Sequence, residues 1–547
     1  MATMNSTKKA TQRKVTKDTK TMKNHHGTTV HKLDALETLF SRVLGSLFGE
    51  STHYEKRTAE SDYEKLVNTI KEVHDDDIEY VLKIARLGRE YNMIQYPLAV
   101  LTACMNDDRF KGENFVDKKT KKNKLQSYAY YIIRRGRDIL DILAMQMSVY
   151  GFTVKGRGKK KHRDTPLPMQ MRKTLKGKLE SFNEYQLSKA LGDSKQVSMA
   201  DAIKLLHPDP TNSKVRKNFY REIIEGKVKM GDDTAQVQSE IAKVNNKNSK
   251  TTKKDVVKSI DTSTVMAIVK NLVALDNQGL FNDKKAVDSI VAKLTDKKEV
   301  QKSRLLPFRF YSAYKEVARL RPSEGKRRVL DALVEALDLS IDNLPDIVGY
   351  SAILIDKSGS MDYKVSSMSV VTAKELACML GAICFKKGIA DVYCFANTCK
   401  LVDNISKKST VMDIMQQLMR VEVGGATYLN YALDAVKNSG TKYTNLIILS
   451  DNDCYSTYGN SFTFNRGWGY SSDDNVNDLI KNGVVKKVYV NNLLGNNFAI
   501  INTDDYRKNL ITGFSERIVD VINTYSSIGT GASDIRVVID NLLGSLH

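Results

Sequence analysis

The chain has 547 residues, of which 41% are hydrophobic, and its 85 Lys and Arg against 64 Asp and Glu give a formal net charge of +21. Because a single hydrophobic core seldom serves more than about 250–300 residues, this length predicts several domains. No run approaches the ~18 to 20 consecutive apolar residues of a membrane-spanning helix, the first 29 residues lack an apolar signal segment, and the six cysteines lack paired spacing. These features predict a cytoplasmic protein with free thiols, no zinc site and no membrane partner.

Residues 1–30 are basic, rich in Thr and poor in apolar residues, which predicts a disordered tail. From residue 31 to 345, apolar residues recur at helical spacing almost throughout. Such stripes occupy 36–47, 63–73, 78–87, 96–105, 125–147, 199–206, 256–275 and 305–320. Many medium helices joined by short loops predict a HEAT-like α-solenoid of stacked helix pairs. Two interruptions, 154–168 and the Lys-, Asn- and Ser-rich 226–254, predict flexible surface loops.

Positive charge is concentrated in this helical part. Residues 346–547 contain 19 Lys and Arg against 20 Asp and Glu, so 66 and 44 of the chain totals lie in residues 1–345, a net charge of +22. Basic clusters occur at 118–124, 134–137, 155–163 and 243–258. Each cluster alone is typical of a solvated surface, but their accumulation in one part of the chain indicates a polyanionic partner, above all nucleic acid.

Beyond residue 345 the pattern changes to alternating strands and helices. Strands are predicted at 348–355, 391–395, 445–450 and 487–490, and helices at 367–385, 411–419, 430–437, 474–481 and 515–525. Such alternation predicts a doubly wound α/β domain with a parallel sheet over residues 346–547.

Oxygen-bearing side chains follow two of these strands. Asp356, Ser358 and Ser360 form an Asp-x-Ser-x-Ser pattern after strand 348–355, Thr427 follows two glycines, and Asp451 ends strand 445–450. Ligands of open α/β sheets bind where parallel strands end, and hard carboxylates with neutral hydroxyls suit Mg²⁺. Ordinary strand-to-loop caps are the alternative for any one of these residues. The five in this order predict a Mg²⁺ site.

The five residues resemble the metal-ion-dependent adhesion site (MIDAS) of a von Willebrand factor A domain. A helical-repeat region followed by such a domain resembles the Ro autoantigen (TROVE) family. Matching stretches are 171–173 through 185–189, the Ala-Ile-Lys-Leu-Leu-His-Pro-Asp-Pro segment at 202–210, Leu-Pro-Phe-Arg-Phe at 306–310, and 356–361, 424–427, 450–452 and 513–514. The basic loop at 155–163 and the insertion near 245 have no counterpart in the family pattern.

The resemblance implies a ring of helical repeats closed by the metal-site domain. It implies binding of small, structured, Y-like noncoding RNA on a basic outer face, and entry of single-stranded 3′ ends of misfolded RNA into a central hole, for RNA quality control. The RNA contacts would be made by Arg172, Lys173, Lys189, Lys204 and His207. A capping histidine and solvated helix surface are the structural alternatives for these residues. The metal site would accept an acidic side chain from a partner protein such as an exoribonuclease.

Catalysis has little support in the sequence. It contains no P-loop, no G-x-S-x-G elbow and no zincin motif. Asp451 and Asp453 beside a Mg²⁺ ion would suggest a nuclease, but two-metal chemistry needs more converging carboxylates than this chain offers there. We therefore expect a protein that is not an enzyme. The alternative to RNA binding is a metal-dependent protein-interaction scaffold without specific RNA binding.

Overall fold

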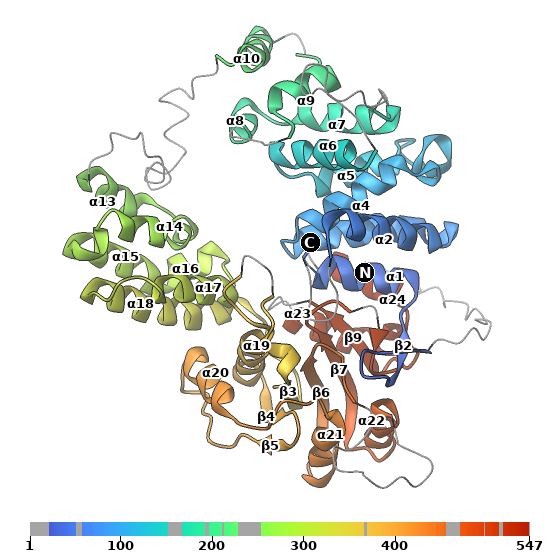
Figure 1. Ribbon diagram of the computed structural model, residues 1–547. Coiled ribbons are helices and arrows are strands. Elements are labelled where there is room, and N and C mark those ends of the chain that lie inside the picture. Colours follow the sequence, from blue (N-terminus) through green and yellow to red (C-terminus); the bar gives the residue numbers. More distant parts are fainter. Residues whose placement is uncertain are drawn as a thin grey trace, which may run out of the picture.

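The computed structural model describes residues 21–545 apart from 47, 51–56, 151–166, 192–195, 211–212, 228–252, 366–368, 456–470, 497 and 514–517. Residues 1–20 of the predicted tail, the basic cluster at 155–163 and most of the predicted loop at 226–254 lie outside the described residues. Two helical arms stand on an α/β domain (Figure 1).

The first arm, here called arm 1, contains helices that the apolar stripes predict, together with α7, α8 and α10, which coincide with none of those stripes. They are α1 (Ala35–Gly45), α2 (Ala59–Glu72), α3 (Ile78–Glu90), α4 (Gln95–Asn106), α5 (Lys124–Ile132), α6 (Gly136–Tyr150), α7 (Met169–Ser181), α8 (Glu184–Ser188), α9 (Met199–Leu206) and α10 (Lys214–Glu225). The stripes are the buried faces: Leu39, Val43 and Leu66 are each fully buried. The single stripe at 125–147 becomes two helices, because the chain turns at extended Ile133.

Arm 2 returns toward the α/β domain. Its helices are α13 (Lys253–Thr262), α14 (Val265–Asn277), α15 (Lys284–Thr295), α16 (Lys297–Ser303), α17 (Pro307–Ala318) and α18 (Glu324–Ser340). Close packing in this arm depends on one glycine of α18: a Cβ atom on Gly325 would lie 1.8 Å from the carbonyl oxygen of Phe281. No sheet of three or more strands occurs among the described residues between 33 and 335, as the stripes predict.

The α/β domain has a six-stranded sheet with strand order β5-β4-β3-β6-β7-β9. Its strands are β3 (Tyr350–Asp356), β4 (Ile389–Phe395), β5 (Cys399–Leu401), β6 (Tyr443–Ser450), β7 (Val485–Asn492) and β9 (Lys508–Thr512). All neighbouring pairs are parallel except β4 and β5, which pair antiparallel. The four predicted strands are present, while the short β5 and β9 had not been predicted.

Helices cover both faces of this sheet, as a doubly wound fold requires. They are α19 (Ala373–Lys387), α20 (Val411–Arg420), α21 (Leu429–Asn438), α22 (Ser472–Lys481), α23 (Ile518–Ile528) and α24 (Ile535–Gly544). Alternate side chains of β3 pack into two different hydrophobic cores, one on each face of the sheet. Ile353 and Ile355 face α19 and α20, whereas Ala352 and Leu354 face α21 and α22. The first of these cores continues into both arms, so the arms and the domain share one apolar interior.

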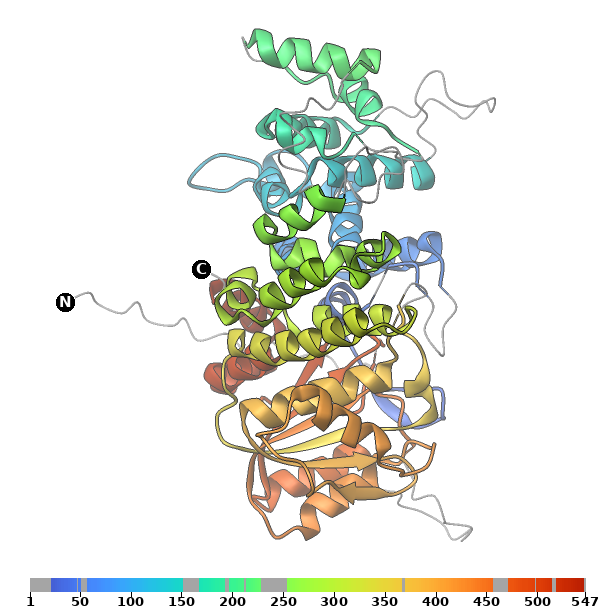
Figure 2. The same cartoon turned by 90° about the vertical axis from the view of Figure 1, so that its left-hand side faces the viewer.

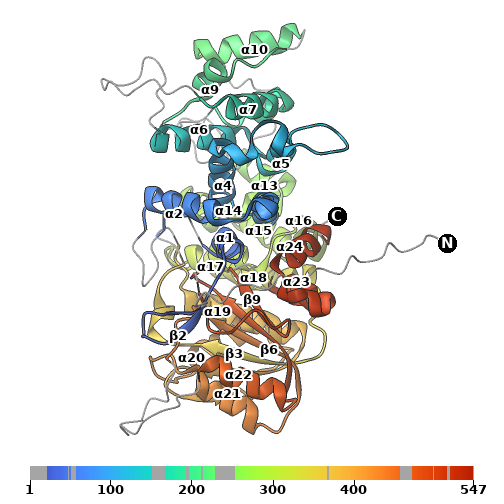
Figure 3. The same cartoon turned by 90° about the vertical axis from the view of Figure 1, so that its right-hand side faces the viewer.

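Ion pairs link each arm to the α/β domain where the two are in contact. Lys83 of α3 lies 2.5 Å from Asp540 of α24, and Lys386 of α19 lies 2.8 Å from Asp338 of α18. Arm 1 also approaches β9 through a glycine, since a Cβ atom on Gly45 would lie 2.2 Å from the Thr512 methyl group. The side views show a tall molecule with α10 at one end and the α/β domain at the other (Figure 2 and Figure 3). In the part of the chain that is described, no helix is long and apolar enough to span a membrane.

The prediction of a disordered tail over residues 1–30 is wrong for residues 21–30. Strands β1 (Thr21–Lys23) and β2 (Thr29–Lys32) form a hairpin, and β2 pairs antiparallel with β8 (Phe498–Ala499). Strands this short have no independent stability in water. They are held because Val30 is buried beside Phe498, some 470 residues away in the sequence.

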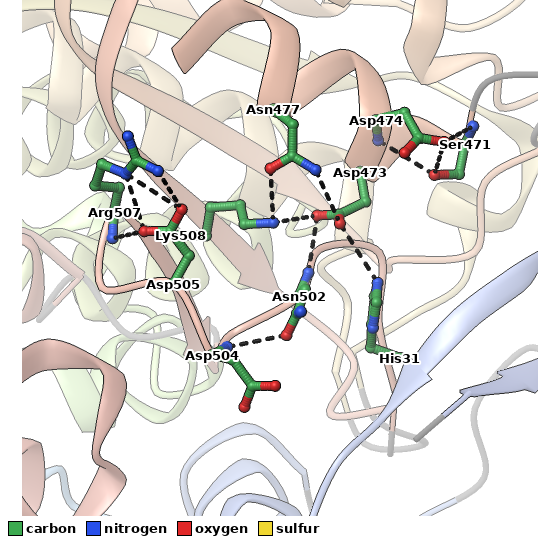
Figure 4. Close-up of polar contacts among 10 residues, drawn as sticks. All are labelled: His31, Ser471, Asp473, Asp474, Asn477, Asn502, Asp504, Asp505, Arg507 and Lys508. Atoms are coloured by element: carbon green, nitrogen blue, oxygen red, sulfur yellow. Dashed lines mark hydrogen bonds and ion pairs between the residues drawn. The ribbon is translucent and has the colours of Figure 1, made fainter. Parts of the chain in front are cut away.

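A polar network ties this hairpin to the α/β domain (Figure 4). Asp473 of α22 accepts hydrogen bonds from the ammonium of Lys508 at 2.7 Å and from the backbone N–H of Asn502 at 2.9 Å. The His31 ring of β2 lies 3.6 Å from the other carboxylate oxygen. One carboxylate therefore joins β2, α22 and the start of β9.

Candidate metal centre and nucleic-acid interface

The predicted metal ligands lie where β3 and β6 end side by side. Because the two strands are adjacent and parallel, Asp356 at the end of β3 and Asp451 just after β6 reach the same edge of the sheet. Asp356 accepts a 2.8 Å hydrogen bond from the Ser358 N–H and a 2.6 Å bond from the Ser450 hydroxyl. The hydroxyl oxygens of Ser358 and Ser360 lie 3.1 Å apart. The first loop is thus folded around its own carboxylate.

The loop that carries Thr427 contacts the other two loops. The Gly359 N–H donates to the Gly425 carbonyl at 2.8 Å, and the Tyr455 N–H donates to the Thr427 carbonyl at 2.9 Å. The side-chain carbonyl of Asn397 also contacts this loop, because it accepts a 2.8 Å hydrogen bond from the Gly425 N–H. All five predicted ligands are buried. The structure therefore brings their three loops together at one edge of the sheet.

The site carries two fully buried carboxylates. Burial first, and then repulsion by Asp451, raises the pKa of Asp356 well above its usual range. Burial also raises the pKa of Asp451, although a hydrogen bond with the Ser360 side chain opposes this effect. The nearest cation in the sequence, Lys357, is directed elsewhere, because its ammonium donates to the carbonyls of Leu418 and Met419 at 2.7 and 2.9 Å.

These residues fit a divalent cation with oxygen ligands. One oxygen of Asp451, Oδ2, is buried and accepts no hydrogen bond from any described residue. A cation beside it would supply the missing partner and offset the repulsion between the carboxylates. No group of three or more His, Cys, Asp or Glu among the described residues could hold a metal. Metal binding here would therefore need the hydroxyls of Ser358, Ser360 and Thr427.

The N-terminal hairpin contacts the loop that follows Asp451, and the sequence interpretation missed this contact. The Asn24 side chain donates to the Cys454 carbonyl at 2.9 Å, and the ring of His26 stacks on Tyr455 with centroids 4.0 Å apart. A weak signal was present in the sequence: two short Thr-containing stretches flank Asn24 and the turn residue Gly27, which has φ +75°.

The five predicted RNA-contacting residues lie toward the far end of arm 1. Arg172 and Lys173 are on α7, Lys189 ends α8, Lys204 is on α9 and His207 follows α9; all five are exposed. The backbone of His207 caps α9 in the left-handed conformation, with φ 47°, and leaves its ring at the surface. Helix α7 packs against α9, so these residues belong to neighbouring elements.

Comparison with known proteins finds one matching family model and proteins that are similar in sequence or in fold. The TROVE domain family model matches residues 250–332, which span arm 2 from α13 to the first half of α18. "RNA-binding protein RO60" of Caenorhabditis elegans is 25% identical over 265 residues, covering 47% of this chain and 39% of that protein. The crystal structure of the Deinococcus radiodurans RO (RSR) protein matches with a TM-score of 0.55 at 17% identity, over 93% of this chain and 100% of that chain. The chain is thus similar to the Ro autoantigen (TROVE) family in sequence over residues 250–332 and to a Ro protein in fold over most of its length.

The structural match covers both parts of this chain. It extends over the helical arms and the α/β domain, so the fold is a helical-repeat ring combined with a von Willebrand factor A-like domain. The chain spans about two-fifths of the length of the curated relative that it matches. The family model covers arm 2, whereas the predicted RNA contacts lie on arm 1 and the predicted metal ligands on the α/β domain.

Proposed function

We propose that this protein binds RNA in a Ro-type ribonucleoprotein in the cytoplasm. Small structured noncoding RNA, of Y-like type, would bind the basic outer surface of the arms. Single-stranded 3′ ends of misfolded RNA would enter the centre of the ring, which suits a role in RNA quality control. We propose no catalytic step: the protein would bind RNA and present it to a partner.

The observation that carries this proposal is the uneven charge of the chain. The net charge of residues 1–345 is +22, whereas residues 346–547 have a net charge of −1. Some of these cations are structural: Arg89, 5% exposed, pairs with the buried carboxylate of Asp138 at 2.8 Å. Others are available to phosphate, since Arg172 and Lys173 make no ion pair with any residue that the structure describes.

Binding should discriminate between RNA shapes. A duplex is too wide and stiff to thread a ring lined by helices, whereas a single strand can thread it and present its bases. We expect fluorescence anisotropy to give tighter binding for a hairpin with a single-stranded 3′ tail than for a blunt duplex of equal length. Log affinity should fall linearly with log salt, by about 0.7 per phosphate contacted on a single strand. Equal affinity for both RNAs, or binding that salt does not change, would contradict the proposal.

A charge-matched pair of variants locates the RNA surface. Replacing Arg172, Lys173 and Lys189 together by Gln should reduce the steepness of the salt dependence, because three phosphate contacts are lost. His207→Ser should weaken binding at an unchanged slope, since it removes a ring and no charge. The control replaces exposed Lys400, Lys407 and Lys486 of the α/β domain by Gln. If this control variant lost as much salt dependence as the arm variant, the RNA surface would not lie on arm 1.

We propose a second function for the α/β domain, supported by the buried oxygen of Asp451 described above. Asp356, Ser358, Ser360, Thr427 and Asp451 would hold Mg²⁺, which when bound offers a coordination position to an acidic side chain of a partner such as an exoribonuclease. The three hydroxyls are neutral, so the two carboxylates only balance the charge of Mg²⁺, and the acidic side chain of a partner could complete its coordination.

Titration calorimetry with Mg²⁺ tests this second function. Asp356→Ala should abolish Mg²⁺ binding and leave RNA affinity largely unchanged, because the excess charge lies in the arms. Asp451→Asn, which keeps the shape of the side chain and removes its charge, should also weaken Mg²⁺ binding. Asp362→Asn is the control, since that carboxylate is 65% exposed and pairs with Lys374. Mg²⁺ affinity that is the same in the wild type and in Asp356→Ala would contradict the site.

A further inference from the structure

Two neighbouring tyrosines at the end of α5 are exposed to solvent. Tyr130 is 60% and Tyr131 is 46% exposed, while Leu125, Ala129 and Ile132 of the same helix are buried. The two rings lie with centroids 6.1 Å apart and planes at 84°. Neither ring therefore packs into the hydrophobic core. Two adjacent exposed aromatic rings are unusual on a protein surface, where charged side chains predominate.

Cations from two other helices contact these rings. The ammonium of Lys178, on α7, lies 3.8 Å from the Tyr130 ring centroid and donates to the Tyr130 carbonyl at 3.0 Å. The guanidinium of Arg86, on α3, lies 4.2 Å from the Tyr131 ring centroid. We call Tyr130, Tyr131, Lys178 and Arg86 the tyrosine platform. Residues of three helices therefore form it, and a cation already contacts each ring.

The surroundings of the tyrosine platform carry positive charge. Three exposed arginines follow it along the chain, and each has a carboxylate partner: Arg134 with Glu90, Arg135 with Asp138, and Arg137 with Asp141. Asp138 is shared with buried Arg89. These carboxylates are thus already matched by cations, and Lys178 adds positive charge beyond them. Lys178 also lies on the same helix, α7, as Arg172 and Lys173 of the proposed RNA surface, six and five residues further along the chain.

We propose that the tyrosine platform is a stacking site for the bases of single-stranded RNA. Each ring would stack on one base, while Lys178 and the neighbouring arginines contact phosphates. Tyrosine stacks on every base, so the site would tolerate any sequence. The combination of exposed rings and cations suits a single strand better than a duplex, whose bases are covered by their own stacking. The inference rests on the proposed RNA binding and adds a position and a mode of recognition to it.

The test measures binding of a labelled 12-nucleotide oligouridine and of a blunt duplex to the full chain by anisotropy. Base–aromatic stacking is worth roughly 1–3 kcal/mol per base, which corresponds to about 5- to 150-fold in affinity. Replacing both tyrosines by Ala should therefore weaken oligouridine binding at least about tenfold, at an unchanged salt slope, and leave duplex binding unchanged. Replacing both by Phe should retain binding, whereas Leu at both positions should not. Val215→Ala, at a residue that is 71% exposed on α10, is the control for loss of an exposed apolar side chain and should have no effect.

Different failures have different meanings. If the wild type binds oligouridine and the Ala variant binds it equally well, the tyrosine platform is not an RNA site although the protein binds RNA. Rescue by Leu would also overturn the proposal, because an apolar contact would then suffice. If the wild type binds no RNA at all, the proposed function itself fails. Lys178→Met gives an independent measurement should the double Ala variant not fold: it should lower the salt slope for oligouridine by about 0.7, and an unchanged slope would count against the site.

Discussion

The side chain of Asp473 links the N-terminal hairpin to α22 and to the start of β9. Its carboxylate accepts from Lys508 and from the Asn502 N–H, and it faces His31 of the hairpin. The substitution Asp473→Asn keeps the shape of the side chain and removes its charge. It therefore leaves the Lys508 ammonium, whose side chain is 3% exposed, buried without a carboxylate.

Two independent estimates give the magnitude of this loss. Burial alone would raise the pKa of Asp473, but hydrogen bonds from His31, Lys508 and the Asn502 N–H outweigh it and lower the pKa to about 2. A shift of this size corresponds to about 2 kcal/mol of stability, present above the unfolded-state pKa near 4 and lost as pH falls toward 2. Removing one partner of a buried ion pair costs about 3–5 kcal/mol, less here because the amide oxygen of the new asparagine would still accept a hydrogen bond. We expect a loss of about 2–4 kcal/mol at neutral pH.

Hydrogen exchange measured by mass spectrometry reports this loss of stability for each peptide of the chain. Peptides that cover residues 21–32 and 498–512 should exchange about 30- to 1000-fold faster in Asp473→Asn than in the wild type. The matched control is Asp474→Asn, because that carboxylate only caps the start of α22 by accepting from Ser471. The double variant Asp473→Leu with Lys508→Met should recover most of the protection, since no buried charge remains. Equal exchange in Asp473→Asn and Asp474→Asn would refute the reasoning.

Three further predictions concern stability and metal binding. Burial, and after it the adjacent Asp34 carboxylate, raise the pKa of Glu37 to about 7. The folded state therefore binds this proton more tightly than the unfolded state does. The free energy of unfolding should fall as pH rises from about 4.5 to 7. Glu37→Gln, which can still form the capping box of α1, should flatten that decline, by up to about 3 kcal/mol, in melting curves recorded between pH 5 and 8. Gly325→Ala should destabilise arm 2 by at least about 1–3 kcal/mol and speed its limited proteolysis, because the new methyl group meets the Phe281 carbonyl. Gly177→Ala is the comparison for a helical glycine substitution without a clash, because nothing lies within 4 Å of its Cβ position. Asn24→Ala should weaken Mg²⁺ binding in calorimetry if the hairpin positions the loop after Asp451, and unchanged Mg²⁺ affinity would mean that the hairpin does not act on that loop.

The arms and the order of the α/β elements follow from local pattern. Stripes such as Leu36, Leu39, Phe40 and Val43 specify a helix and its buried face, because side chains three and four residues apart share one face whatever the helix packs against. The apolar runs at 352–355 and 446–449 are typical of strands buried on both faces, and they form the centres of β3 and β6. The meeting of Asp356 and Asp451 could be predicted as well, since adjacent parallel strands end at one edge.

Other features depended on contacts between distant parts of the chain. Strands β1, β2 and β8 are two to four residues long, too short for any periodicity to indicate them, and they exist because Val30 and Phe498 bury each other. Sequence alone could count the cations of residues 1–345 but could not divide them into structural and available ones. Arg89 is buried against Asp138, 49 residues away, whereas Arg172 lies at the surface. Composition and periodicity therefore determined the helices, the sheet and the excess of charge, because these are local or summed properties. Only tertiary packing decided which charges remain exposed, where the hairpin lies and which tyrosines stand beside cations, because each of these depends on residues that are distant in sequence.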